Sequence, residues 1–321
     1  MIARLNPGGQ EHTIVVAIGG NALQAPGEHG GIHEQFAHTR ESMAALVELA
    51  REGWHLAVVH GNGPQVGDGL LRNELARHEV PPLPLGVLVA ATAGWIGYMI
   101  QQSLQNALAR AGVDRPVATV VTQVMVDPMD PSMRAPSKPI GRVMDEARAR
   151  KLGADLGWTM GRAGEGWRRV VPSPRPTAVV EGAQVRRLVE DGTIVVALGG
   201  GGTPVYADPE LGLEGVDAVV DKDRAAAVLA HAIGAELLLI LTNVDGVYRH
   251  FDTPDQVLVE RLTLLEAEAL LASDELGSGS MRPKVEAAVE FLRGGGGRAC
   301  IARLDRGIAA VAGEAGTSIV P

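Results

Sequence analysis

The segment TIVVAIGG at residues 13–20 recurs almost unchanged as TIVVALGG at residues 193–200. Each copy is an apolar run rich in β-branched residues, which predicts a buried strand, and each runs directly into glycines. Glycine lets the backbone turn sharply and expose its N–H groups, a geometry that can cradle an anion. A glycine that merely ends a strand is the commoner case for one copy. Because the unit is used twice, we interpret both turns as parts of an anion-binding site.

Apolar runs of this kind alternate along the chain with amphipathic helical stretches. The alternation is typical of an α/β protein with an open, mainly parallel central sheet and helices on both of its faces. The predicted strands are Ile14–Ile18, His55–Val59, Pro116–Thr122, Ile194–Leu198, Leu237–Leu241 and Arg298–Ala302. The predicted helices lie near residues 34–52, 64–78, 86–111, 181–191, 222–233 and 282–293.

Residues 125–172 differ in character from the parts of the chain on either side. They contain several prolines and glycines and two of the four tryptophans, Trp158 and Trp167. A long segment of low periodicity inside a compact domain is usually a functional cover or a flexible loop. We therefore predict an N-terminal half over residues 1–190, with a lid subdomain inserted at about 125–172, and a C-terminal half over residues 191–321.

The charge and cysteine content of the chain argue against several kinds of partner and location. The formal net charge is −9, the sequence pI is about 5.5 and no Lys/Arg-rich run occurs, so nucleic acid and an anionic membrane are unfavourable partners. The single cysteine, Cys300, cannot form an intrachain disulfide, which favours a reducing compartment and hence the cytoplasm. No basic segment precedes an apolar run at the N-terminus, so we expect no signal peptide.

Residues 80–109 carry no charge, but they do not predict a membrane span. Their apolar part, Leu85–Ile100, is shorter than the roughly 20 residues that a span requires, and polar residues follow it. The predicted helix over 86–111 is instead expected to be buried or to lie at the interface of a homodimer.

Lysine is rare in this chain. Of the 29 basic residues only four are lysine, at positions 138, 151, 222 and 284, and the other 25 are arginine. A lysine kept in such a chain is expected where a compact ammonium group on a flexible stem is needed, as at a phosphate. The alternative is that the four lysines have no particular role. The sequence around each lysine decides between these two interpretations.

Two further glycine-rich turns follow predicted strands. In HGNGPQVG at 60–67, Gly61 and Gly63 permit a tight turn and Pro64 suits the first turn of a helix. The glycine spacing does not match the dinucleotide-binding fingerprint, and no P-loop sequence occurs in the chain. GGGGTPV at 199–205 is the second such turn.

Two of the lysines lie at predicted helix N-termini. Lys222 stands between Asp221 and Asp223 in VVDKDRAAAVLA, and Lys284 follows Ser280, a candidate N-cap, in GSMRPKVEAAVEFL. A solvated surface lysine is the alternative for each. Together they suggest one polyphosphate bound between the two helices. LLLILTNVDGVY at 237–248 adds a buried strand whose end is a position where open α/β sheets place ligands.

Nine short motifs follow one another along essentially the whole chain. They are IGGNAL, HGNGPQVG, TQVMVDP, PSKPIG, GWRRVVPSP, GGGGTPV, VDKDRAA, LTNVDGVY and GSMRPKVEA. The set resembles the carbamate kinases of the amino acid kinase family. The resemblance implies a homodimer that transfers a phosphoryl group reversibly between ATP and carbamate, giving ADP and carbamoyl phosphate. ATP synthesis during arginine catabolism is the direction that it suggests.

The resemblance also implies roles for particular residues. Lys138, Lys222, Asp223 and Lys284 would be catalytic, with Lys138 reaching in from the lid and Asp223 orienting lysines. Carbamate or carbamoyl phosphate would contact Gly19, Gly20, Asn21, Gly61, Asn62, Gly63, Gly200 and Gly201. The nucleotide would contact Lys222, Thr242, Asn243, Val244, Tyr248, Met281 and Lys284. We expect no metal ligand in the chain, with Mg²⁺ carried by the nucleotide phosphates, and we assign no role to Arg282 or Lys151.

The chemistry of the implied reaction fits the absence of an obvious base. Carbamate is already an anionic oxygen nucleophile, so aligning two anions and stabilising charge is sufficient. His60 is accordingly interpreted as a turn residue. Two alternatives remain: a related kinase acting on a carboxylate or on UMP, and a noncatalytic nucleotide-binding sensor. The related kinases commonly carry a lysine near the first Gly-Gly turn, where this chain has Asn21.

Overall fold

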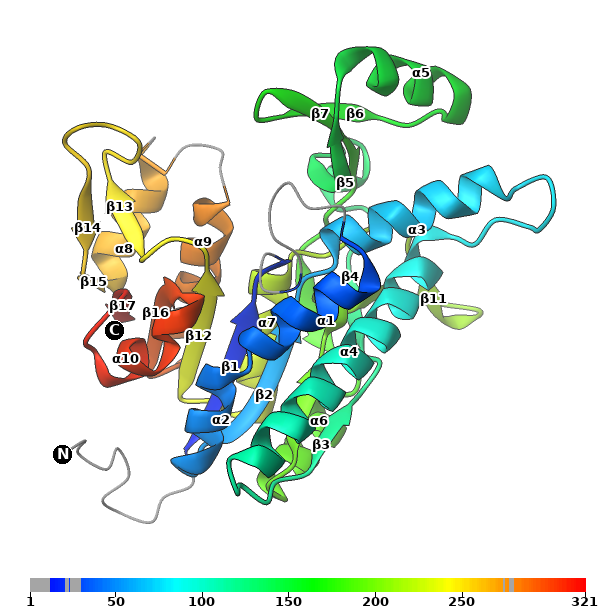
Figure 1. Ribbon diagram of the computed structural model, residues 1–321. Helices are drawn as coiled ribbons and strands as arrows, with labels where there is room; N and C mark the ends of the chain where they lie inside the picture. Colours follow the sequence, from blue (N-terminus) through cyan, green and yellow to red (C-terminus); the bar gives the residue numbers. More distant parts are fainter. Residues whose placement is uncertain (1–11, 21–22, 24–29, 274, 277–279) are drawn as a thin grey trace.

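The computed structural model describes residues 12–20, 23, 30–273, 275–276 and 280–321. Within these ranges an eight-stranded sheet forms the centre of the molecule (Figure 1). In spatial order its strands are β15 (Arg261–Thr263), β17 (Thr317–Val320), β16 (Arg298–Arg303), β12 (Leu237–Thr242), β1 (Thr13–Ile18), β2 (His55–His60), β9 (Ile194–Ala197) and β3 (Val117–Thr119). Neighbouring strands are parallel except for β16 and β17. The predicted α/β class with a mainly parallel sheet is therefore confirmed.

Strand β1 shows why these sequences form a sheet buried on both faces. Alternate side chains point to opposite faces of a strand. Val15 and Ala17 accordingly join one apolar cluster, whereas Ile14, Val16 and Ile18 join another. All five side chains are fully buried. A continuous apolar run is therefore what this position in the sheet requires.

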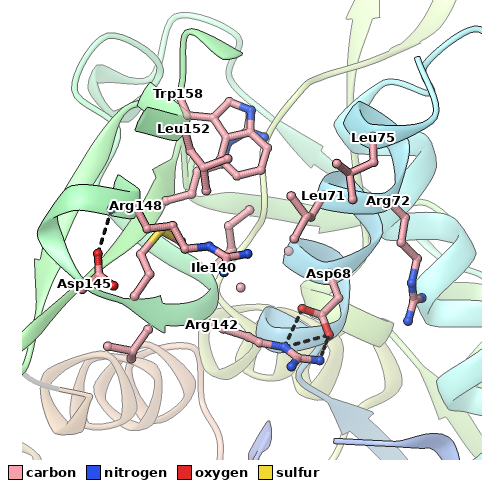
Figure 2. A pocket seen from close by; sticks show the side chains of 15 residues that line it. Asp68, Leu71, Arg72, Leu75, Ile140, Arg142, Asp145, Arg148, Leu152 and Trp158 are labelled. Carbon is pink, nitrogen blue, oxygen red and sulfur yellow. Dashed lines mark hydrogen bonds and ion pairs between the residues drawn. The ribbon is translucent and has the colours of Figure 1, made fainter. Parts of the chain in front are cut away.

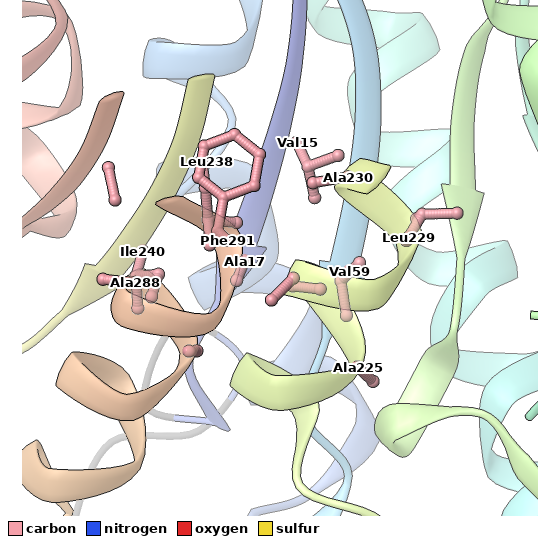
Figure 3. Close-up of a cluster of buried hydrophobic side chains, with 14 of the residues drawn as sticks. Val15, Ala17, Val59, Ala225, Leu229, Ala230, Leu238, Ile240, Ala288 and Phe291 are labelled. Carbon is pink, nitrogen blue, oxygen red and sulfur yellow. The ribbon is translucent and has the colours of Figure 1, made fainter. Parts of the chain in front are cut away.

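Helices cover both faces of the sheet. Figure 3 shows Val15 and Ala17 packed with Ala225, Leu229 and Phe291, which come from two helices on the same side. The helices are α1 (Ile32–Glu41), α2 (Ala44–Arg51), α3 (Gly63–Leu75), α4 (Leu85–Arg110), α5 (Glu146–Leu156), α6 (Gly182–Glu190), α7 (Lys222–Ile233), α8 (Leu264–Ala272), α9 (Met281–Arg293) and α10 (Gly307–Ala312). No helix among the described residues is long and apolar enough to cross a membrane.

Two sequence predictions of elements need correction. The helix predicted over residues 34–52 is two helices, α1 and α2, with a break at Ser42, whose hydroxyl donates a hydrogen bond of 2.8 Å to the carbonyl of His38. Such back-bonding competes with the regular helix ladder. The strand predicted over Pro116–Thr122 ends at Thr119, because the chain then turns into a second sheet that begins at Gln123.

The remaining strands form smaller sheets. The second sheet has the order β11 (Gly212–Gly215), β10 (Thr203–Asp208), β4 (Gln123–Val126) and β8 (Pro176–Val179), and a hairpin joins β13 (Val247–Arg249) to β14 (Val257–Val259). Short 3-10 helices lie at Pro131–Met133, Gly199–Gly201 and Leu304–Arg306.

A third sheet stands away from the central sheet, together with α5 (Figure 1). It consists of β5 (Lys138–Met144), β7 (Gly166–Val171) and β6 (Met160–Ala163) in that order. We call these three strands and α5 the small subdomain. The guanidinium of Arg169 lies 4.3 Å from the ring centre of Trp158, and Arg162 lies 5.0 Å from that of Trp167, so both tryptophans pack within it.

Candidate functional site

The predicted binding turns lie together at one edge of the central sheet. Strands β1, β2, β9 and β12 run parallel, so their carboxyl ends meet at the same edge. The segments that follow these strands are Gly19–Gly20, Gly61–Gly63, Gly199–Gly201 and Thr242–Tyr248. Open α/β sheets bind ligands at this edge.

The turns lie against one another and against Lys222. A Cβ built on Gly61 would lie 3.3 Å from Cδ of Lys222 and 3.5 Å from the backbone nitrogen of Gly20. On Gly200, whose φ is +69°, a Cβ would lie 2.2 Å from Nδ2 of Asn62. Glycine at 200 therefore lets the turn after β9 meet Asn62, and Gly61 lies close to the stem of Lys222.

Of the two asparagines predicted to contact carbamate or carbamoyl phosphate, Asn62 lies among the described residues and Asn21 does not. Asn62 is 2% exposed, and its Nδ2 donates a 2.8 Å hydrogen bond to Oγ1 of Thr92 on α4. One of its amide hydrogens is thus already used to hold the turn in place. Asn21 lies outside the described residues, so its predicted role stays a prediction.

Three lysines and two aspartates form a connected group beside these turns, which we call the lysine–aspartate cluster. Lys138 donates to Asp221, and Lys222 donates to Asp223. Lys284 donates to the other oxygen of Asp223 at 3.0 Å. The cluster joins β5 of the small subdomain to the N-termini of α7 and α9. Three of the four lysines in the chain are therefore in one place.

Burial and charge oppose each other in the cluster. Burial alone would raise the pKa of Asp221, but the ammonium groups of Lys138 and Lys222 outweigh it and hold that pKa well below its usual range. Burial would likewise raise the pKa of Asp223, but the ammonium groups of Lys222 and Lys284 outweigh burial and lower that pKa. Burial lowers the pKa of Lys222, with Asp223 acting in the opposite direction. The two carboxylates are therefore ionised and orient the lysines.

Asp221 performs a second task that its sequence position explains. It is the N-cap of α7, and its Oδ1 accepts hydrogen bonds of 3.0 Å from Asp223 N and 3.4 Å from Arg224 N. The other carboxylate oxygen accepts from Lys138. One residue thus starts α7 and ties the small subdomain to the central sheet.

Local backbone structure holds Lys138 and Lys284 in place. Lys138 is the first residue of β5 and pairs with Val171 of β7. Ser280 occupies the N-cap position of α9 without a side-chain capping hydrogen bond. Its carbonyl instead accepts from Nζ of Lys284 at 3.3 Å. That contact helps to hold Lys284, which is only 7% exposed, beside the cluster.

The predicted nucleotide loop follows β12. The side chain of Thr242 bonds that of Asn243 at 3.3 Å, and the hydroxyl of Tyr248 donates to Asp245 at 3.0 Å. Asn243 is exposed, whereas Val244 and Tyr248 are half-buried. Met281, the first residue of α9, is also half-buried. These side chains lie at the carboxyl end of the sheet without forming part of the lysine–aspartate cluster.

A cavity of about 560 Å³ lies elsewhere, between α3 and the small subdomain. Figure 2 shows Arg142 of β5 reaching Asp68 of α3 across it, with Nη2 and Oδ2 2.8 Å apart. Trp158 and Leu71 lie on opposite sides of the cavity (Figure 2). None of the predicted site residues lines it, so we regard it as a crevice beneath the small subdomain.

Among the described residues, no group of three His, Cys, Asp or Glu side chains is placed to hold a metal ion. Sequence reasoning overlooked the contact of Asp221 with Lys138, which no local pattern signals.

Comparisons with known proteins agree with this geometry. A profile of the amino acid kinase family matches residues 12–303. Carbamate kinase of Pyrococcus horikoshii is 42% identical over 311 residues, which cover 96% of this chain and 99% of that protein. Carbamate kinase from Giardia lamblia bound to citric acid has a TM-score of 0.92 at 35% identity, covering 97% of this chain and 98% of the other. Its form bound to AMP-PNP has a TM-score of 0.87 at 36% identity, with the same coverage.

The parallel sheet, the glycine turns at its carboxyl edge and the family match define the class: the chain belongs to the amino acid kinase family. The carbamate kinases of Pyrococcus horikoshii and Giardia lamblia are each more than 30% identical to this chain, over nearly the full length of both chains compared. Within the family, the chain is a member of the carbamate kinases.

Proposed function

We propose that this protein catalyses reversible phosphoryl transfer between ATP and carbamate, giving ADP and carbamoyl phosphate. The observation that carries the proposal is the lysine–aspartate cluster at the carboxyl edge of the sheet, beside the glycine turns of both halves. Relatives that are carbamate kinases over nearly their full length support the same reaction. ATP synthesis from carbamoyl phosphate is the direction that we propose.

Charge stabilisation is the main task of such a site. Two anions must be brought into line, and the transferred phosphoryl group spreads negative charge over its oxygens. Preorganised ammonium groups and backbone N–H groups stabilise that charge without reorganising during the reaction. Lys138, Lys222 and Lys284 supply the ammonium groups, and Asp221 and Asp223 fix their positions. Because carbamate is an anionic oxygen nucleophile, no general base is needed.

We assign the two substrates to different parts of the site. The nucleotide lies on the C-terminal half, residues 191–321, against α7, α9 and the loop Thr242–Tyr248. Carbamate or carbamoyl phosphate lies on the N-terminal half, residues 1–190, at the turns that follow β1 and β2. The related Giardia lamblia structure bound to AMP-PNP supports a nucleotide site in this fold.

Mg²⁺ enters this scheme as part of the nucleotide substrate. Asp221 and Asp223 already bond lysines, so neither carboxylate is free to act as a dedicated metal ligand. We therefore propose that the nucleotide phosphates carry the ion and that it neutralises part of their charge.

Assembly and location are further parts of the proposal. Helix α4 leaves Val87, Ala91 and Tyr98 exposed along its first half, and we propose that this face forms a homodimer interface. We propose the cytoplasm as the location because the one cysteine of the chain needs no oxidising compartment.

One assay tests the proposal against its alternatives. Purified protein is mixed with ADP, Mg²⁺ and carbamoyl phosphate, and ATP formation is measured. Parallel reactions offer ATP with N-acetylglutamate, aspartate, glutamate or UMP. We expect ATP only from carbamoyl phosphate. Turnover of another acceptor would identify a different kinase of the family, and ATP binding without any turnover would identify a sensor.

A further inference from the structure

The crevice beneath the small subdomain is large enough for a small organic molecule. Its volume of about 560 Å³ lies within the range of roughly 300–1,000 Å³ that is usual for ligand pockets. Apolar side chains line both of its sides: Leu71 and Leu75 on α3, and Leu152 and Trp158 on the small subdomain opposite them (Figure 2). The crevice therefore offers a sheltered surface for the apolar body of a ligand.

The charge of the crevice is opposite in sign to that of the whole chain. The chain has a formal net charge of −9, but four arginines and only two aspartates line the crevice. Both aspartates already have partners. Asp68 pairs with Arg142 across the crevice, and Asp145 accepts from the backbone nitrogen of Arg148 as the N-cap of α5. The lining arginines that form no ion pair within the described part of the chain are Arg72, Arg148 and Arg169.

Arg169 is the least exposed of these three arginines. It is half-buried, its guanidinium stacks on the ring of Trp158, and its Nη1 is buried without a hydrogen-bond partner. Burial lowers the pKa of Arg169, and the carboxylates of Glu74 and Asp217 oppose that shift without forming an ion pair with it. A buried donor without an acceptor is unfavourable, so an anionic oxygen bonded to this guanidinium would relieve the cost.

The three unpaired arginines come from different elements that meet at the crevice. Arg72 lies on α3, Arg148 on α5 and Arg169 on β7. Figure 2 shows the side chain of Arg148 extending from α5 towards α3, between Trp158 and Arg142. Guanidinium groups bind carboxylates and phosphates through pairs of parallel hydrogen bonds. The crevice thus combines several free guanidinium groups with an apolar wall.

We propose that the crevice beneath the small subdomain is a second binding site, which takes a small organic anion with an apolar body. The carboxylate or phosphate group of the ligand bonds Arg148 and Arg169, and its body packs between Leu71 and Trp158. No residue of the lysine–aspartate cluster lines the crevice, so the two sites are separate. The bound ligand contacts both sides of the crevice and therefore stabilises the packing of the small subdomain against α3.

Four probes test which chemistry the crevice recognises. Isothermal titration calorimetry measures the binding of phenyl phosphate, phenylacetate, inorganic phosphate and 2-phenylethanol to the full-length protein. The first two combine a ring with an anion and distinguish a phosphate from a carboxylate ligand. The other two carry only the anion or only the ring. We expect at least one aromatic anion to bind with a Kd below about 1 mM, and the two partial probes to bind at least about tenfold more weakly.

A pair of variants on one helix places the binding. Arg148→Ala removes a charged hydrogen bond and should raise the Kd of the aromatic anion about ten- to hundredfold. Arg150 also lies on α5, but it pairs with Glu146 on the surface and does not line the crevice. Arg150→Ala should therefore keep the wild-type Kd. Both arginines are exposed, and thermal unfolding of each variant checks that it folds.

The remaining outcomes contradict the proposal. If neither aromatic anion binds, or if 2-phenylethanol or inorganic phosphate binds as tightly, the crevice is not a site for an organic anion. Binding that ADP or carbamoyl phosphate abolishes, or that Arg148→Ala leaves unchanged, would place the probe in the substrate site instead. The titrations involve no turnover, so a protein that fails to make ATP from carbamoyl phosphate would overturn the proposed function and leave this test valid.

Discussion

Lys138 belongs to the small subdomain, yet its ammonium group bonds Asp221 at the N-terminus of α7. We expect Lys138→Ala to lower kcat about 10²- to 10³-fold, the usual loss for one preorganised electrostatic donor. Affinity for ADP should change little. Lys138→Arg should recover little of kcat, because a planar fork does not replace a compact ammonium group in a closed site. Steady-state kinetics with carbamoyl phosphate and ADP measure both effects.

Lys151 provides the matched control for that substitution. It is the other lysine of the small subdomain, it pairs with Asp155 on the surface of α5, and its side chain is 74% exposed. Lys151→Ala should keep the wild-type kcat. If Lys138→Ala behaves like Lys151→Ala, Lys138 has no part in the chemistry.

His60 gives a prediction about pH. Burial lowers its pKa from 6.5 to about 4, while its Nδ1 donates to the carbonyl of Gly61 at 3.0 Å. The folded protein therefore keeps His60 neutral at pH values where the unfolded chain protonates it. Stability should be complete above pH 6.5 and fall by about 3 kcal/mol as the pH drops to 4. Urea unfolding at several pH values measures this, and His60→Gln should remove most of the slope in that window.

At the residue scale, the rarity of lysine was the strongest signal in the sequence. It singled out Lys138, Lys222 and Lys284, and the structure places all three in one cluster. The contact of Lys138 with Asp221 gave no such signal, because the two residues lie 83 positions apart in the chain. Such a pairing is visible only in three dimensions.

Helix α3 and strand β5 pack with their backbones in direct contact near the site. A Cβ on Gly67 would lie 2.1 Å from the Cα of Gly141, so the two backbones touch. We expect Gly67→Ala to push β5 away from α3, at a cost of about 1–3 kcal/mol in unfolding free energy. Because β5 begins with Lys138, kcat should fall as well. Chemical denaturation and steady-state kinetics measure the two effects.

Gly69 on the same helix is the control. A Cβ there would lie 4.0 Å from Cδ2 of Leu88, an ordinary van der Waals contact. Gly69→Ala should stabilise the protein by about 0.5–1 kcal/mol, because alanine favours a helix interior over glycine, and should leave kcat unchanged. Equal behaviour of Gly67→Ala and Gly69→Ala would show that the α3–β5 contact does not position Lys138.

At the element scale, periodicity predicted long elements and missed short ones. The apolar strands and helices such as α7 and α9 lie close to their expected ranges. Helix α8 was missed, although Thr263 and Glu266 form a capping box there, a local signal that was available. The strands of the small subdomain carry mixed polar and apolar residues, because the subdomain buries little of their surface, so no period marked them.

Homodimer formation through α4 is a prediction about the whole molecule. Ala91 lies on the exposed face of α4 between Val87 and Tyr98, which are 48% and 55% exposed. Sedimentation velocity at micromolar concentration should show a dimer for the wild-type protein. Ala91→Arg should shift it to a monomer, because an arginine on an apolar interface loses hydration without a partner.

An alanine-to-arginine change on another surface helix controls for a general effect of added charge on dimer formation. Ala147 is exposed on α5, away from α4 (Figure 1). Ala147→Arg should remain dimeric. A monomeric wild-type protein, or an Ala91→Arg variant that stays dimeric, would contradict an interface at this face.

The strand order of the central sheet has a consequence for how the protein is synthesised. Strand β1 is translated before the other strands of this sheet, yet it lies in the middle, between β2 and β12. It cannot gain its second neighbour until residue 242 has been translated. Strand β9 likewise enters between the earlier β2 and β3. The apolar edge of β1 therefore stays unpaired until β12 has been translated, and the central sheet is complete only after β17 has joined it.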